Sequence, residues 1–123
     1  LHILYPTGKS QEVRHPRAPH LFKRADIVAG DFLYINRFMP DDMKGKIIIT
    51  NTVTQNDIDT LRQLGVNILV TTTPKMNGRS FGANVLQAIF VAILEKRPDS
   101  IRPEEYLQLM EFLGIQPRVV HFR

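Results

Sequence analysis

Five short apolar runs alternate along the chain with stretches whose apolar residues recur at helical spacing. Their length and their valine and isoleucine content are typical of strands. Those runs are LHILY (1–5), DIVAG (26–30), KIIIT (46–50), NILVT (67–71) and RVVHF (118–122). The inner three are continuous rather than alternating, as in a parallel sheet covered on both faces. We therefore expect an α/β protein, a Rossmann-like three-layer sandwich with a mostly parallel five-stranded sheet.

Helix signals fill the intervals between these runs. Thr54, followed three residues later by Asp57, predicts an N-cap with a capping box. The helix over 83–96 is apolar nearly all round, which indicates that it lies in the core or packs on a partner. The patterns predict helices over residues 19–23, 32–39, 55–64, 83–96 and 103–113.

The size and composition of the chain limit its class. At 123 residues it is long enough for one core and too short for two, so we expect residues 1–123 to form one α/β domain. The chain opens on Leu1 inside a predicted strand, which indicates the C-terminal domain of a longer protein whose N-terminal domain is missing. It has no cysteine, no signal peptide and no apolar segment of membrane length, so we expect a cytoplasmic location without membrane contact.

Polar residues gather where the predicted strands end. In open α/β sheets, ligands bind beyond the carboxyl ends of the strands. We therefore expect a small anionic or phosphorylated ligand there, with a nucleotide as one possibility. The predicted ligand-binding residues are Thr7, Lys9, Asn51, Thr52, Thr73, Gly78, Arg79 and Ser80.

The loop TTTPKMNGRSFGAN (71–84) carries the best chemistry for an anion. Gly78 allows close backbone approach, and Arg79 can make a bidentate contact to phosphate or carboxylate. Ser80 can cap the following helix, whose free N–H groups favour negative charge. The alternative interpretation is a polar, helix-capping loop with Arg79 in solvent.

Two nucleotide motifs are absent. TGKS (7–10) lacks the glycine that a phosphate-binding loop needs five residues before Gly8, because Ile3 stands there. A GxGxxG fingerprint for NAD(P) does not occur. His15 and His20 suit no helix face and have no acidic neighbours, so no metal site is expected.

Positive charge is concentrated at the start of the chain. Residues 1–24 hold five basic residues and one acidic residue, whereas the remainder is balanced. A basic patch attracts phosphorylated ligands, nucleic acid or an acidic partner, and it is also typical of a solvated face. No surface that combines aromatic and basic residues supports nucleic-acid binding.

Several stretches resemble one known bacterial family over essentially the whole chain. ILYPTG, ADIVAGDFLYINRFMP, TNTVTQNDIDTLRQLGV, TTTPKMNGRSFGANV and PEEYLQLMEFLGIQPRVV are similar to the C-terminal portion of proteins labelled quinate or shikimate 5-dehydrogenase-like. The resemblance implies that an N-terminal domain has been removed, and that NAD(P) serves as hydride carrier.

Shikimate dehydrogenases carry an NVTxPxK motif whose lysine is catalytic. This chain reads NILVTTTPK, so Lys75 follows Pro74 directly and is the candidate catalytic lysine by a partial match. The family's catalytic aspartate and glycine-rich cofactor turn have no counterpart. The sequence leaves three functions open: small-anion binding, an NAD(P)-dependent dehydrogenase-like activity, and an interaction module that forms a homo-oligomer.

Overall fold

The computed structural model describes residue 9 and residues 13–73, 75–76, 79–80 and 82–123. For residues 75, 76, 79, 80 and 83 it describes the backbone alone. The elements in chain order are α1 (Pro19–Arg24), β1 (Ile27–Ala29), α2 (Phe32–Phe38), β2 (Ile47–Thr50), α3 (Gln55–Gln63), β3 (Ile68–Thr71), β4 (Lys75–Met76), β5 (Arg79–Ser80), α4 (Ala83–Leu94), the 3₁₀ helix η2 (Pro98–Ser100), α5 (Pro103–Phe112) and β6 (Arg118–His121).

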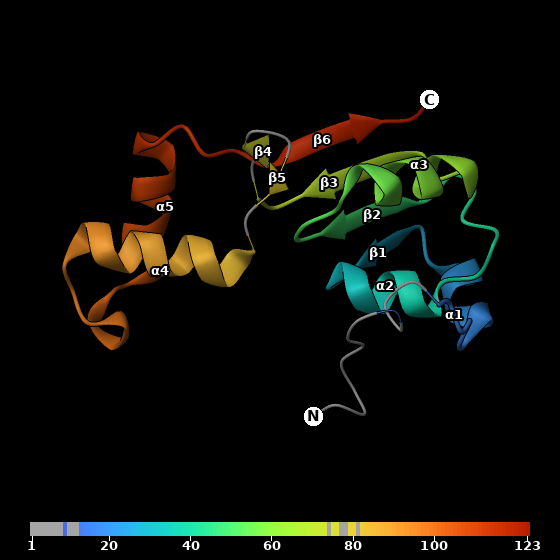
Figure 1. Ribbon diagram of the computed structural model, residues 1–123, viewed down its shortest axis with the longest axis horizontal. Helices are drawn as coiled ribbons and strands as arrows, with labels where there is room; N and C mark the ends of the chain where they lie inside the picture. Colours follow the sequence, from blue (N-terminus) through green and yellow to red (C-terminus); the bar gives the residue numbers. More distant parts are fainter. Residues whose placement is uncertain (1–8, 10–12, 74, 77–78, 81) are drawn as a thin grey trace.

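The main sheet has the strand order β1-β2-β3-β6. Strands β1, β2 and β3 are parallel, and β6 runs antiparallel to β3. This confirms the predicted α/β fold with a mostly parallel sheet (Figure 1). Four of the five predicted strands are found, and the fifth, over residues 1–5, lies outside the described residues.

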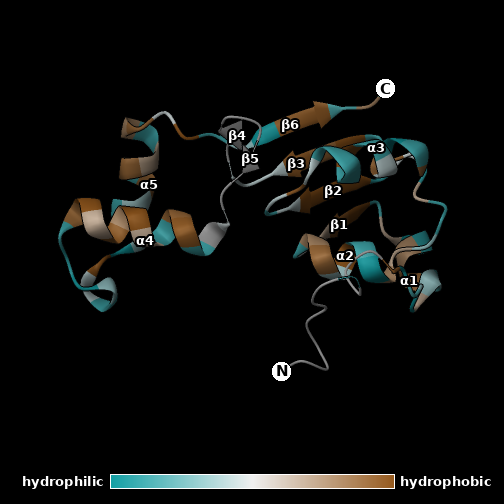
Figure 2. Cartoon of the chain, in the orientation of Figure 1, coloured by the Kyte–Doolittle hydropathy of each residue, from teal (hydrophilic) through white to brown (hydrophobic). Residues whose placement is uncertain are grey.

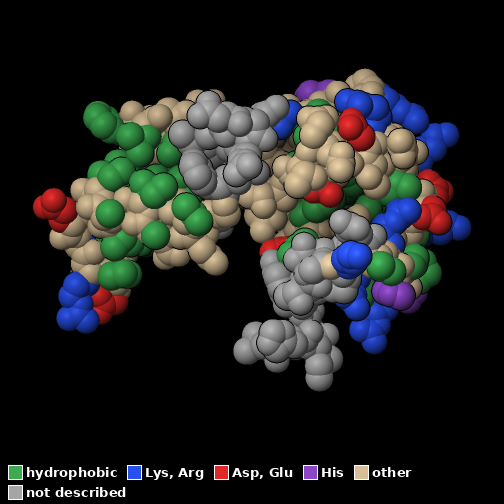
Figure 3. Space-filling model, viewed as in Figure 1, with side chains coloured by type: hydrophobic (Ala, Val, Ile, Leu, Met, Phe, Trp, Pro, Cys, Tyr) green, Lys and Arg blue, Asp and Glu red, His purple; other side chains and the backbone are tan. Residues whose placement is uncertain are grey.

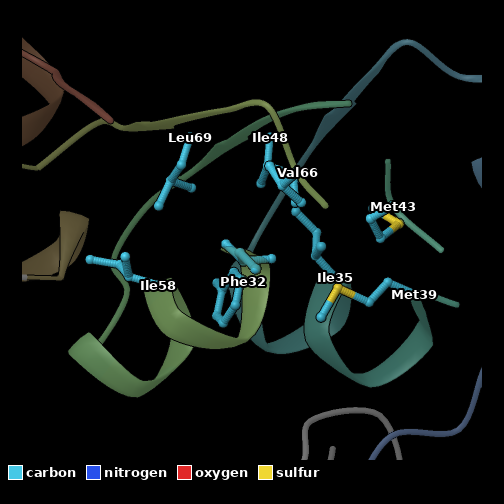
Figure 4. Packing of buried hydrophobic residues seen from close by; sticks show 9 residues of the cluster. Phe32, Ile35, Met39, Met43, Ile48, Ile58, Val66 and Leu69 are labelled. Atoms are coloured by element: carbon cyan, nitrogen blue, oxygen red, sulfur yellow. The ribbon is translucent and has the colours of Figure 1, made fainter. Parts of the chain in front are cut away.

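Helices α2 and α3 cover one face of this sheet. Both belong to crossovers between adjacent parallel strands, and right-handed crossovers in one direction place their helices on the same face. Phe32 of α2 and Ile58 of α3 point toward Ile48 and Leu69 of the strands (Figure 4). The fully buried core also contains Met39, Met43, Leu61 and Val66.

The opposite face of the sheet is much more open. Burial alternates along β2 and β3, so that Ile48 and Leu69 are buried while the residues beside them are only half-buried. At the two edges, Ile27 is 54% and Val119 is 53% exposed. The prediction of a sheet covered on both faces is therefore not met by the described helices, because both packed helices lie on one side.

Local capping signals set the helix ends largely as predicted. Asp31 accepts a hydrogen bond from the Leu33 N–H, and Thr54 and Asp57 form a reciprocal capping box. The prediction that Ser80 caps the helix after the loop is wrong. That helix has Gly82 as its N-cap, and Ser80 instead belongs to the two-residue strand β5.

Helices α4 and α5 form a hairpin that projects beyond the carboxyl ends of β1, β2 and β3 (Figure 1). The ring of Phe90 lies against that of Tyr106, with centroids 6.3 Å apart. A salt bridge also joins Lys96, which follows α4, to Glu105 of α5. Phe90 is the one residue of α4 classed as buried among those whose side chains are described, so the core position predicted for this helix is not observed.

Hydrophobic residues run along β2, β3 and α4 (Figure 2). None of the described helices is both long and apolar enough to cross a bilayer.

Candidate functional site

The carboxyl edge of the sheet brings together two of the predicted binding residues. Thr73 Oγ1 donates a hydrogen bond to the backbone oxygen of Asn51 over 2.9 Å. Asn51 Nδ2 in turn donates to Asp31 Oδ2 over 3.0 Å. Thr50 Oγ1 donates to the Gly30 carbonyl over 2.7 Å. The parallel register thus places the ends of β1, β2 and β3 in one hydrogen-bonded cluster, as expected.

The polar groups of this cluster are largely engaged with one another. Asn51 Oδ1 accepts a hydrogen bond from the Phe32 N–H at 3.3 Å, and Asp31 caps α2. Asp31 was not among the predicted site residues, although its place directly after a strand signalled a polar edge. Its carboxylate opposes an anion at this point, so the cluster is better suited to joining strand ends than to gripping phosphate.

The remaining predicted residues divide into three groups. Thr52 is half-buried at the same edge, and Lys9 is exposed. Thr7 and Gly78 lie outside the described residues. For the candidate catalytic residue Lys75, and for Arg79 and Ser80, the backbone forms the antiparallel pair β4–β5, with Lys75 opposite Ser80. Anion binding and catalysis by these side chains stay predictions.

A small cavity of about 290 Å³ lies between the end of β3 and the hairpin. Aromatic and aliphatic side chains make most of its wall, so it suits an apolar group better than an anion. Its lining residues are Thr72, Thr73, Leu86, Gln87, Phe90 and Tyr106.

A larger polar groove of about 630 Å³ lies between α2 and α3. Arg14 lines it, and its Nη2 pairs with the exposed Asp41 at 2.9 Å. Arg14 Nη1 is buried without a hydrogen-bond partner among the described residues. The basic opening of the chain was the signal that could have singled out Arg14. Asp57 lines the same groove, and Arg14 already has an acidic partner, so the described charges give this groove no preference for anions.

The outer surface of α4 is apolar. The helix contains no charged residue, and Val85, Ile89 and Ile93 are 48%, 39% and 51% exposed. Their spacing of four residues places them on one side of the helix, and we call them the α4 stripe. Figure 3 shows hydrophobic side chains gathered over the hairpin, whereas most charged side chains lie over the other half of the molecule.

The second apolar surface is the face of the sheet that no described helix covers. Strand register aligns its side chains in two rows across the four strands. We call this surface the open sheet face. It consists of Ile27, Ala29, Ile47, Ile49, Ile68, Val70 and Val119, with His121 at the end of one row.

The turn between α4 and α5 is held by Glu105. The ammonium group of Lys96 and the backbone N–H of Arg102, the latter at 3.0 Å, both donate to its carboxylate. These contacts hold the pKa of Glu105 below its ordinary value of 4.5. The hairpin is therefore fixed at the packed rings of Phe90 and Tyr106 and again at the turn.

No group of three or more histidine, aspartate or glutamate side chains suited to a metal occurs within the described part of the chain.

The comparisons with known proteins add a family and no activity. No curated protein and no solved structure matches the chain. No link to quinate or shikimate dehydrogenases comes with the family found. Its sequence profile matches residues 1–122, which is essentially the whole chain. The chain therefore belongs to the family described as a domain of unknown function, DUF8754.

Proposed function

We propose that this domain is an interaction module, and that the α4 stripe and the open sheet face bind another polypeptide. The observation that carries the proposal is the exposure of Val85, Ile89 and Ile93 on a helix without charge. A helix of this composition is normally buried on more than one side.

The energetics favour covering these surfaces. Fully burying one isoleucine or valine side chain contributes about 1.5–3 kcal/mol. The three residues of the α4 stripe are each roughly half exposed, so covering them alone is worth a few kcal/mol. Contiguous apolar patches of this kind mark interaction sites in soluble proteins.

A docked helix would also complete the predicted architecture. The continuous valine and isoleucine runs of β2 and β3 are typical of strands covered on both faces. We infer that a helical layer on the open sheet face turns the described two layers into the Rossmann-like three-layer sandwich.

A photoreactive amino acid in place of Ile89 tests this proposal in living cells. We expect a covalent adduct with a second polypeptide, identified by mass spectrometry of the linked peptides. The matched control is the same residue in place of Gln63, which is exposed on α3, away from both surfaces. Adducts formed only within a single copy of the chain, or equal adducts from both positions, contradict an interaction module.

Small-anion binding is a second candidate function, carried by the basic loop beside the carboxyl edge of the sheet and not by the Asp31 cluster itself. Asn51 and Thr73 lie together there, next to the backbone of the β4–β5 pair that carries Lys75 and Arg79. A ligand at 100 times its dissociation constant raises the free energy of unfolding by about 2.7 kcal/mol. We expect inorganic phosphate or NADP to raise the unfolding temperature, and Arg79→Ala to abolish the shift. If the ligand raises the unfolding temperature of wild type and Arg79→Ala equally, Arg79 is not part of an anion site.

A dehydrogenase-like activity remains a prediction from the sequence alone, and it rests on Lys75 in the β4–β5 pair. It predicts NAD(P)-dependent oxidation of quinate or shikimate that Lys75→Ala removes. A pure protein that binds NADP without turnover contradicts the activity and leaves the anion site standing.

A further inference from the structure

We propose that the partner is a second copy of this chain, and that two copies exchange hairpins. In this dimer the α4–α5 hairpin of each copy lies on the open sheet face of the other. The inference rests on the proposed interaction function, because it assigns the occupant of the same two surfaces.

The two surfaces match in size. Strands of three or four residues in a four-stranded sheet make a face roughly 19 Å wide and 13 Å long. Helix α4, with 12 residues, is about 18 Å long. With its side chains, a helix is about 10–12 Å across. Laid across the four strands, α4 therefore spans the width of the face, and α5, which crosses α4, is not needed to cover it (Figure 1).

The two surfaces also match in chemistry. The open sheet face is built from isoleucine, valine and alanine, with His121 at its margin, and α4 has no charged residue. A contact made through α4 buries no carboxylate, lysine or arginine, so it avoids the desolvation cost that opposes the burial of charge. The glutamates of the hairpin (Glu104, Glu105 and Glu111) belong to α5 and stay outside this contact. A nucleic acid or an acidic peptide finds no cation on either surface.

The area argument favours exchange over a one-sided contact. A face of these dimensions has a planar area of about 250 Å², so one docked hairpin buries about 500 Å² over both surfaces. This is below the roughly 1,000 Å² that a specific interface should at least reach. Reciprocal docking doubles the buried area to about 1,000 Å² and reaches that level. A partner that offers one helix alone does not reach it.

Exchange also gives a closed assembly. Each copy gives one hairpin and receives one, so a two-fold axis relates the copies and no docking surface is left over. The projecting hairpin in Figure 1 has the extended form that an exchanged element takes in its protomer.

Mass measurement of the intact chain is the first test. We expect light scattering to give twice the chain mass of 14.1 kDa. Ile89→Glu places a carboxylate in the α4 stripe and should weaken dimerisation at least tenfold, with the circular dichroism of the monomer retained because Ile89 is exposed. Gln63→Glu adds the same charge on α3 and should leave the dimer intact. A strict monomer at high concentration, or a dimer insensitive to Ile89→Glu, overturns the proposal.

Engineered cysteines identify the contact, since the chain has none of its own. One protein carries Ile49→Cys at the centre of the open sheet face, and a second, tagged protein carries Ile89→Cys. We expect oxidation of the mixture to link tagged to untagged chains. Links between two Ile89→Cys chains alone overturn the exchange, because they report contact between hairpins.

A chain with both cysteines separates the failure of this inference from that of the proposed function. If it closes on itself as a monomer, the hairpin covers its own sheet, and both the exchange and the interaction module are wrong. The double-cysteine chain can instead remain an unlinked monomer while the photoreactive Ile89 variant captures a different protein in cells. In that case the assignment of a second copy as the partner is wrong, and the interaction module stands.

Discussion

Lys46 is the clearest case of a single side chain that ties elements together. It is 9% exposed, and its Nζ donates to the carbonyl oxygens of Ala25 at 2.7 Å and Lys23 at 3.3 Å. These bonds fasten the end of α1 to the start of β2.

We expect Lys46→Met to lower the free energy of unfolding by about 1–3 kcal/mol, because it leaves a shielded carbonyl without its donor. Urea denaturation measures this loss. Lys44→Met is the matched control, since Lys44 is exposed two residues away. Equal denaturation midpoints for the two variants would show that the buried bonds carry no net stability.

At the scale of elements, the sequence predicted what local chemistry determines. Thr54 with Asp57, and the stop at Gly65, predicted α3 because caps and left-handed glycines act within a few residues. Ser80 was misassigned as a cap because it pairs across β4–β5, a contact that capping preferences do not express. The runs at β2 and β3 signalled burial on both faces, but such runs do not say which segment covers a strand.

The hairpin of α4 and α5 gives a prediction about pH. The pKa of Glu105 is lowered in the folded chain, chiefly by the hydrogen bond from Lys96. A lowered carboxyl pKa stabilises the fold above the ordinary value of 4.5, and this contribution is lost as the pH falls through the folded pKa.

Lys96→Met should therefore destabilise the protein near neutral pH, and the difference from wild type should shrink as the pH falls below 4.5. Denaturant midpoints over a pH series measure it. Arg97→Met serves as control, since the pair of Arg97 with Asp99 is highly exposed. A difference for Lys96→Met that does not change with pH would assign its effect to packing.

At the scale of the whole molecule, the carboxyl edge and the apolar surfaces differ in how far the sequence predicts them. Parallel strand order alone brings Asn51 and Thr73 together, so their proximity could be predicted from the sequence. The hydrogen bond from Asn51 to Asp31 could not be predicted, because it depends on side-chain geometry between elements. The charge-free composition of α4 was visible in the sequence, but its exposure is a property of the assembled fold.

The exchange of hairpins makes stability depend on protein concentration. Unfolding a dimer in which each copy covers the other also separates the chains, so a tenfold rise in concentration adds about 1.4 kcal/mol per dimer to the free energy of unfolding. For a domain of this size, that raises the unfolding temperature by a few degrees.

Calorimetry at two concentrations a factor of ten apart checks this dependence. We expect the shift in wild type and in Gln63→Glu, and none in Ile89→Glu, which should unfold as a monomer at a lower temperature. If the wild-type transition stays fixed while Ile89→Glu still lowers it, the α4 stripe is covered within one chain. Stability would then come from a closed monomer instead of from assembly.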